Sequence, residues 1–104
     1  METYVIFRRS GWTVAADLEE AATRANDEVE RMPDDVAWIR SYALAERDGR
    51  IGTVCIYRAS SPEAIRSHSR AAEFPIDEIV RVADTIVVRP EPIAVPRVER
   101  EEKG

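Results

Sequence analysis

The stretch Val36–Ala59 constrains the fold more than any other part of this sequence. It contains two segments rich in β-branched and aromatic residues, separated by Asp48-Gly49. Such residues suit a pleated, half-buried surface, and Gly49 accepts the positive φ that a tight connection requires. The stretch therefore predicts a β-hairpin. Because a strand and a helix are predicted on each side of it, the expected chain order is βαββαβ.

The segment before the hairpin predicts a strand and then a helix. Tyr4–Phe7 is a short apolar run closed by residues 8–11, and Thr13 is placed to cap the helix that follows. Apolar residues then recur at steps of three and four, which predicts one face turned toward a sheet. They are Val14, Leu18, Ala21, Ala22, Ala25, Val29 and Met32. The acidic residues fall on the other faces and predict a solvated surface, and Pro33 ends the helix.

After the hairpin, Ser60-Ser61-Pro62-Glu63 combines a serine cap, a proline in the first turn and an early acid, which predicts a second helix reaching about Glu73. Its expected inward face is Ala64, Ile65, His68, Ala71 and Ala72. Phe74-Pro75 ends this helix. The apolar residues of 80–88 predict the last strand. Prolines and charges dominate from residue 90 onward, so we expect a ferredoxin-like domain over 1–89 and an extended or disordered tail over 90–104.

Composition excludes several classes of protein. A length of 104 residues with 44% hydrophobic and 34% charged residues is typical of one soluble domain. The net charge of -5 disfavours nucleic acid or an anionic membrane as a partner. Cys55 is the single cysteine, so no disulfide framework is available, and no apolar run approaches the ~18 residues of a membrane span. The opening residues lack the pattern of a signal peptide, so a cytoplasmic location is expected.

Four strands, one hairpin and two helical crossovers predict an antiparallel sheet with both helices on one face, the ferredoxin-like α+β arrangement. Both sides of the predicted strands are apolar, although the helices can cover only one. In the second strand the two sides are Val36, Trp38, Tyr42 and Leu44 against Ala37, Ile39 and Ala43. A second copy packed on the open face would cover it, so we expect a homodimer; the alternative is that the tail folds back over this face.

The candidate site residues are His68 and a group of aromatic and basic side chains. His68 lies on the inward stripe of a helix otherwise lined with alanine. It can be a buried histidine bonded to a carbonyl or a tyrosine hydroxyl, a metal ligand, or a proton-transfer or ligand-binding group. Trp38, Arg40 and Tyr42 are expected to share one face of a strand. With Tyr57 and His68 they would form a pocket suited to a small anionic or aromatic molecule.

The sequence contains no residue pattern that is typical of a known catalytic class. Cys55 is flanked by apolar residues in the middle of a predicted strand, which predicts a small, buried, apolar side chain. No glycine-rich phosphate loop, Ser-His-Asp pattern or pair of catalytic carboxylates can be identified. The sequence therefore assigns no catalytic residue, and these stay unknown.

Several short motifs together resemble a family of small bacterial domains of unknown function that includes an actinobacterial nickel-binding protein. They are Trp38-x-x-Ser41-Tyr42, Cys55-x-Tyr57-x-Ala59, Ala64-Ile65-x-x-His68 and Phe74-Pro75-x-Asp77-x-Ile79. The resemblance spans residues 4–88 and implies a ferredoxin-like fold, a homodimer and, for the nickel-binding member, a role in metal sequestration.

The resemblance leaves the ligand open. Where the family carries acidic residues in the first strand and after the hairpin tyrosine, this chain has Phe7 and Arg58. His68 alone cannot close a nickel site and would need partners such as Asp77, Glu78 or a second His68. We therefore expect a small dimeric ligand-binding domain that binds nickel or another transition metal weakly, if at all, through His68. The alternatives are a cofactor-free enzyme of the dimeric α+β barrel type, with His68 as acid or base, and an interaction module without a ligand.

Overall fold

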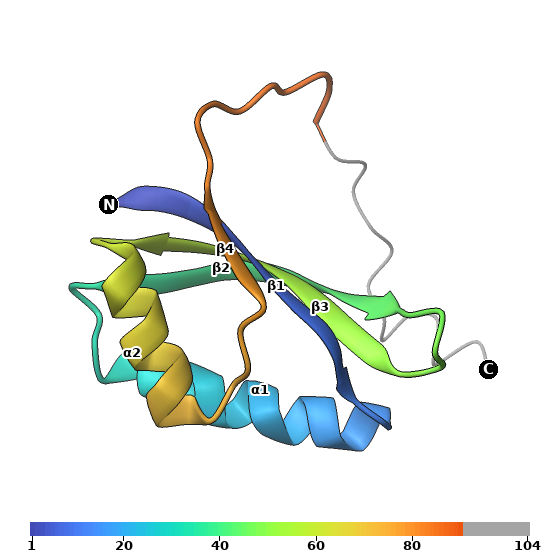
Figure 1. Ribbon diagram of the computed structural model, residues 1–104. Helices are drawn as coiled ribbons and strands as arrows, with labels where there is room; N and C mark the ends of the chain where they lie inside the picture. The colour runs from blue at the N-terminus through green and yellow to red at the C-terminus, as the bar shows by residue number, and fades with distance from the viewer. Residues whose placement is uncertain (91–104) are drawn as a thin grey trace, which may run out of the picture.

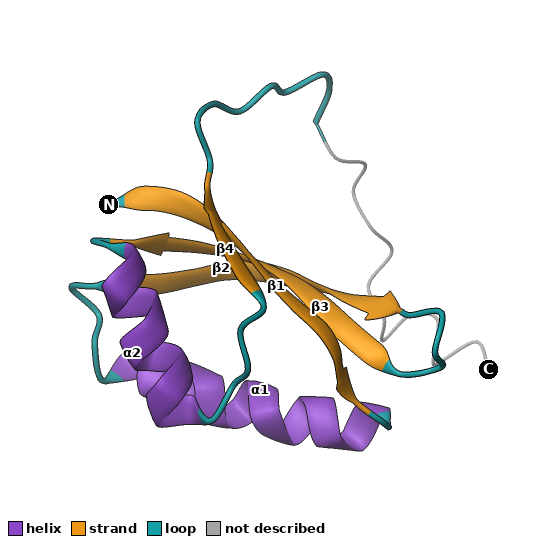
Figure 2. Cartoon of the chain, in the orientation of Figure 1, coloured by secondary structure: helices purple, strands orange, loops and turns teal. Residues whose placement is uncertain are grey.

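A computed structural model describes residues 1–90 and confirms the predicted chain order (Figures 1 and 2). The elements are β1 (Glu2–Trp12), α1 (Ala15–Glu30), β2 (Val36–Ala45), β3 (Ile51–Ala59), α2 (Pro62–Ala72) and β4 (Glu78–Arg81). Neither helix is long and apolar enough to cross a membrane. Beyond Pro90, the predicted tail lies outside the described residues.

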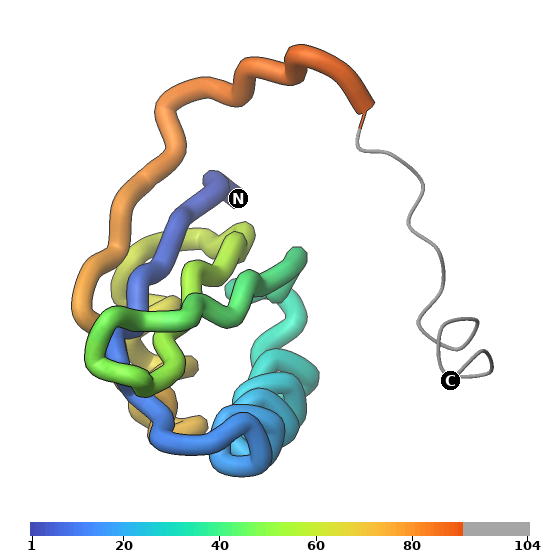
Figure 3. Tube along the Cα trace, turned by 90° about the vertical axis from the view of Figure 1, so that its right-hand side faces the viewer, coloured from blue at the N-terminus to red at the C-terminus, as the bar shows by residue number. Residues whose placement is uncertain are grey.

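The strands form one antiparallel sheet in the order β2-β3-β1-β4. Both helices cover the same face of this sheet, and the opposite face carries no element of residues 1–90 (Figures 1 and 3). This is the ferredoxin-like α+β fold. The core lies between the sheet and the helices and comprises Tyr4, Ile6, Trp12, Ala21, Ala25, Val36, Cys55, Tyr57, Ala59, Ile65, Ala72 and Phe74.

The two helices begin differently. The Ser61 side chain accepts a hydrogen bond from the Ala64 amide at 3.1 Å, which confirms the predicted cap of α2. In α1 the predicted Thr13 cap is wrong, because Val14 occupies the cap position and no side chain caps the helix. The inward face of α2 also differs from the prediction: Ala71 is exposed and Ser69 is buried.

The first and last strands of the chain differ from the prediction in length. β1 continues through the four residues that were expected to close it, and the last strand ends at Arg81 instead of residue 88. The reason is that β4 runs antiparallel to β1 with Tyr4 opposite Arg81, so β1 soon offers no further partner. The last bond joins the Val82 amide to the Thr3 carbonyl at 2.8 Å. The apolar residues that follow remain exposed, at 87% for Ile86, 75% for Val87 and 81% for Val88.

The second strand contains a β-bulge. Trp38 lies opposite Tyr57, but Arg40 lies opposite the preceding residue of β3, Ile56. Ile39 is therefore the extra residue, and the alternation of side chains inverts after it. The expectation that Trp38 shares a face with the residues two and four positions later is wrong for this reason.

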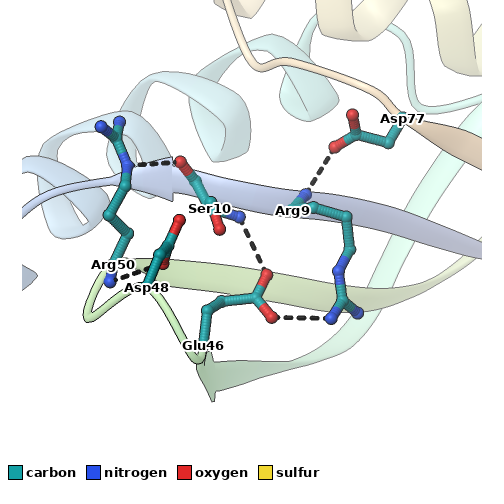
Figure 4. Close-up of polar contacts among 6 residues, drawn as sticks. All are labelled: Arg9, Ser10, Glu46, Asp48, Arg50 and Asp77. Carbon is teal, nitrogen blue, oxygen red and sulfur yellow. Dashed lines mark hydrogen bonds and ion pairs between the residues drawn. The ribbon is translucent and has the colours of Figure 1, made fainter.

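A polar network fixes the second half of β1 against the hairpin (Figure 4). The Glu46 carboxylate accepts hydrogen bonds from Arg9 Nη2 at 2.7 Å and from the Ser10 amide at 2.9 Å. Arg50 Nε donates to the Ser10 carbonyl at 2.8 Å. Glu46 can approach because Gly52 has no side chain: a Cβ there would clash with Glu46 Oε2.

Candidate ligand-binding site

A fully buried arginine lies between the sheet and α2. Tyr4, Ile6 and Arg8 alternate on the helix-facing side of β1, and Arg8 is 0% exposed. Its Nη2 donates to Ser69 Oγ at 3.1 Å, and its Cζ lies 4.0 Å from the ring centroid of Phe74. Arg8 Nε and Nη1 have no hydrogen-bond partner among residues 1–90. Among residues 1–90, one neutral hydroxyl is thus the only hydrogen-bond acceptor for this buried positive charge.

Tyr57 and His68 lie next to this guanidinium, and both are fully buried. The Tyr57 ring centroid is 5.9 Å from Arg8 Cζ and 5.5 Å from the His68 ring centroid. Within the described part of the chain, the Tyr57 hydroxyl has no partner. Burial raises the pKa of this hydroxyl, although the adjacent Arg8 guanidinium opposes the shift through its charge and a weak side-chain interaction, so Tyr57 is a neutral phenol at physiological pH.

The backbone of α1 fixes the tautomer of His68. Its Nε2 lies 2.7 Å from the Ala25 carbonyl oxygen, which can only accept, so Nε2 carries the proton. The other ring nitrogen, Nδ1, is a buried acceptor without a partner in residues 1–90. Burial lowers the pKa of His68, and the charge of Arg8 lowers it further, against the opposing effect of the Ala25 hydrogen bond. The imidazole is therefore neutral at pH 7.

These three residues form the Arg8–Tyr57–His68 cluster, which holds four buried polar atoms without partners in the described chain: Arg8 Nε, Arg8 Nη1, the Tyr57 hydroxyl and His68 Nδ1. Most buried polar atoms in native proteins are hydrogen-bonded, so each exception requires an explanation. A cluster of such atoms around one charge is suited to bind a polar ligand.

An aromatic layer separates the cluster from a small pocket. Trp38 stacks on Tyr57 with the ring centroids 5.6 Å apart and an interplanar angle of 14°, and Trp38 and Phe74 lie 6.1 Å apart. On the other side of this layer is a pocket of about 170 Å³. It is lined by Leu18, Ala22, Trp38, Ser41, Ala43, Thr53 and Phe74. The lining holds no charged side chain, and Trp38 and Phe74 belong to both the pocket and the layer.

A larger and more open groove of about 570 Å³ follows the end of α2. Its lining mixes charges of both signs, namely Arg66, Arg70, Glu73, Asp77 and Glu78. Small-molecule sites are usually enclosed, apolar and supplied with a few convergent polar groups. The pocket beside Trp38 fits that description better than this groove.

The structure brings together three of the five predicted ligand-binding residues. Trp38, Tyr57 and His68 meet between sheet and helices, but Arg40 and Tyr42 lie on the open face, where Arg40 Nη1 donates to the Tyr42 hydroxyl at 3.4 Å. The bulge at Ile39 causes this separation. Cys55 is buried in mid-strand, as predicted.

Neither Arg8 nor Ser69 was predicted from the sequence as a residue of the site. The alternation of β1 continues from Ile6 to Arg8, and this signal could have placed the arginine inside. Ser69 follows Ile65 by four residues and therefore lies on the same stripe of α2.

The described residues of one chain do not fit a nickel site. Residues 1–90 contain no group of three or more histidine, cysteine, aspartate or glutamate side chains placed to hold a metal ion. His68 has one ring nitrogen left for coordination, and the nearby Arg8 charge disfavours a cation there. Phe7 and Arg58, at the positions where acids are expected, lie on the open face, and Arg58 Nη2 donates to the Met1 carbonyl at 2.8 Å.

One solved structure supports this fold, and a second is similar to a lesser degree. The solved structure of SCO4226 from Streptomyces coelicolor A3(2) aligns with a TM-score of 0.65 at 20% identity, covering 81% of this chain and 99% of that one. SnoaB, a cofactor-independent oxygenase from Streptomyces nogalater, aligns with a TM-score of 0.44 at 16% identity, covering 86% of this chain and 100% of that one. No protein with a curated description matches the chain. The family model described as nickel responsive protein SCO4226-like matches residues 4–82, and the chain therefore belongs to the SCO4226-like family.

Proposed function

We propose that this protein is a small dimeric ligand-binding domain that binds an organic molecule between its sheet and its helices. The observation that carries the proposal is the Arg8–Tyr57–His68 cluster, in which four buried polar atoms have no partner among residues 1–90. The uncharged pocket of about 170 Å³ beside Trp38 supplies room for an apolar body. Engineered apolar cavities of roughly 150 Å³ bind benzene, so a single-ring compound is a reasonable size for this site.

A metal is the weaker candidate ligand. The family description names nickel, but the described residues of one chain supply no set of donors for it. Nickel bound through His68 alone would be held weakly. The enzymatic alternative depends on His68 Nδ1, which is free to accept a proton, whereas the acid role requires a protonated imidazole that burial opposes.

The dimeric part of the proposal rests on the open face of the sheet. Apolar side chains cover it, and none of the described helices lies over them. They include Val5, Phe7, Tyr42, Val54, Ile56 and Val80. A second copy of this chain would remove this apolar surface from water.

The test is an amide NMR titration of the native protein with phenol, benzoate and benzylamine. We expect at least one compound to bind with a submillimolar dissociation constant and to shift the amides of Trp38, Ser41 and Thr53. Ala43→Phe fills the pocket and should abolish these shifts. Ala45→Phe, on the same strand but outside the pocket lining, should leave them unchanged.

Two outcomes would contradict the proposal. If none of the three compounds binds, the pocket is not a ligand site. If calorimetry with NiCl₂ instead gives micromolar binding that is lost in His68→Ala, the ligand is a metal ion.

A further inference from the structure

The buried guanidinium of Arg8 restricts the chemistry of the ligand. Among residues 1–90 it forms no ion pair, and its single hydrogen bond is to the neutral hydroxyl of Ser69. The flanking rings of Phe74 and Tyr57 offer their faces but no negative charge. A buried charge without a counter-charge is unfavourable unless something else in the site compensates it. Carboxylates and phosphates both match the planar fork of a guanidinium, and the carboxylate is the smaller of the two and the better fit beside a small uncharged pocket.

His68 and Tyr57 add a second requirement. Because the Ala25 carbonyl holds the Nε2 proton, His68 Nδ1 can only accept a hydrogen bond. The unpartnered Tyr57 hydroxyl can either donate or accept. A ligand that fills the cluster must therefore bring a negative acceptor for Arg8 and a donor for His68 Nδ1.

We propose that the ligand is a small aromatic carboxylic acid that also bears a hydroxyl group. Its carboxylate pairs with Arg8, its hydroxyl donates to His68 Nδ1, and its ring lies among the aromatic side chains. This inference rests on the function proposed above and specifies the ligand of the same site.

The same geometry assigns a gating role to Trp38. Its ring stacks on Tyr57 and stands between the pocket and the cluster. Trp38 is only partly buried and is held by a hydrogen bond from Nε1 to Ser41 Oγ at 2.7 Å. Phe74, the other ring of the layer, is 3% exposed and lies directly against Arg8. The proposed binding mode requires Trp38, the less buried of the two rings, to move when the carboxylate reaches Arg8.

The test compares 4-hydroxybenzoate with 4-hydroxybenzamide, a neutral compound of nearly the same shape, by calorimetry on the native protein. We expect the acid to bind at least about tenfold more tightly, the ratio that one charge-assisted hydrogen bond gives. Benzoate, which lacks the hydroxyl, should bind more weakly than 4-hydroxybenzoate. In Arg8→Met the preference for the acid should disappear, and the melting temperature should rise because an uncompensated charge has left the core.

Arg9→Met is the matched control, because the Arg9 side chain is exposed and pairs with Glu46 at the surface. It should keep the preference of the native protein. Equal affinities of the native protein for the acid and the amide would overturn the inference while leaving the proposed site intact. Absence of binding by both compounds would overturn the inference if phenol still binds, and would refute the proposed function only if phenol, benzoate and benzylamine fail to bind as well. If Arg8→Met retained the preference, the carboxylate would not bind at Arg8.

Discussion

At the scale of single residues, His68 couples the core to pH. Its ring is fully buried, and it faces Arg8 from β1, Tyr57 from β3 and Glu28 from α1. Burial lowers the pKa of the folded imidazole below the 6.5 expected in an unfolded chain. Below pH 6.5 the unfolded chain therefore binds a proton that the folded protein does not. The contribution of His68 to stability is complete above this pH and is lost as the pH falls.

We accordingly predict that the free energy of unfolding decreases between pH 6.5 and pH 5.5, with a slope of at most about 1.4 kcal/mol per pH unit. His68 is the only histidine in the chain, so no other imidazole contributes in this range. Urea denaturation at pH 7.5, 6.5 and 5.5 measures the effect. His68→Gln should show a nearly flat profile, and an equal slope in this variant would disprove the assignment.

Arg8 is a residue of the site whose burial could not be predicted from the sequence alone. An arginine that follows a short apolar run normally indicates the end of a strand, because charged residues are seldom fully buried. Here the strand continues and the alternation places the guanidinium inside. His68, Tyr57 and Trp38 could be predicted because each is an amphipathic side chain on an apolar stripe. The buried guanidinium beside Tyr57 and His68 could not be predicted.

At the scale of elements, the hairpin and both helices could be predicted, because turn residues and apolar periodicity are local signals. The bulge in β2 could not be predicted, since Ile39 is as suitable for a regular strand as its neighbours. Because of this one extra residue, the side chains of Arg40 and Tyr42 lie on the open face. The early end of β4 likewise depends on where β1 begins, which is a tertiary constraint.

The close approach of the hairpin to β1 depends on Gly52, which has no side chain. In Gly52→Ala, the new Cβ would clash with Glu46 Oε2 and would lie 2.7 Å from the Arg8 carbonyl oxygen. Because the second contact is with backbone, relief requires the strand to shift, and we expect a loss of about 1–3 kcal/mol in the free energy of unfolding. Urea denaturation at neutral pH measures this loss.

Gly11→Ala is the control for this substitution. Its Cβ would have one ordinary contact, at 3.6 Å from the Pro75 side chain. This variant should be as stable as the native protein or slightly more stable, because alanine restricts the unfolded chain. A similar loss in both variants would mean that glycine itself, and not the close approach at Gly52, determines stability.

Within residues 1–90, the sheet of this molecule has one face covered by helices and one face without helices. The open face carries apolar residues of all four strands, with Tyr42 at 47% exposure and Val80 at 41%. Residues 82–90 leave the sheet on the side of this open face and carry the exposed residues Ile86, Val87 and Val88 (Figure 1). A chain with both features gains buried apolar area when it associates.

We therefore predict a homodimer joined through the open face, with a mass in multi-angle light scattering of twice the 11.8 kDa of one chain at micromolar concentration. Lysines substituted for Tyr42 and Val54, which lie opposite each other in β2 and β3, should yield a folded monomer, because their charges cannot be buried between two sheets. Ala71→Lys adds a charge to the exposed side of α2 and should leave the dimer intact. A native protein with the mass of a single chain would rule out this assembly, and the open face would then need another partner.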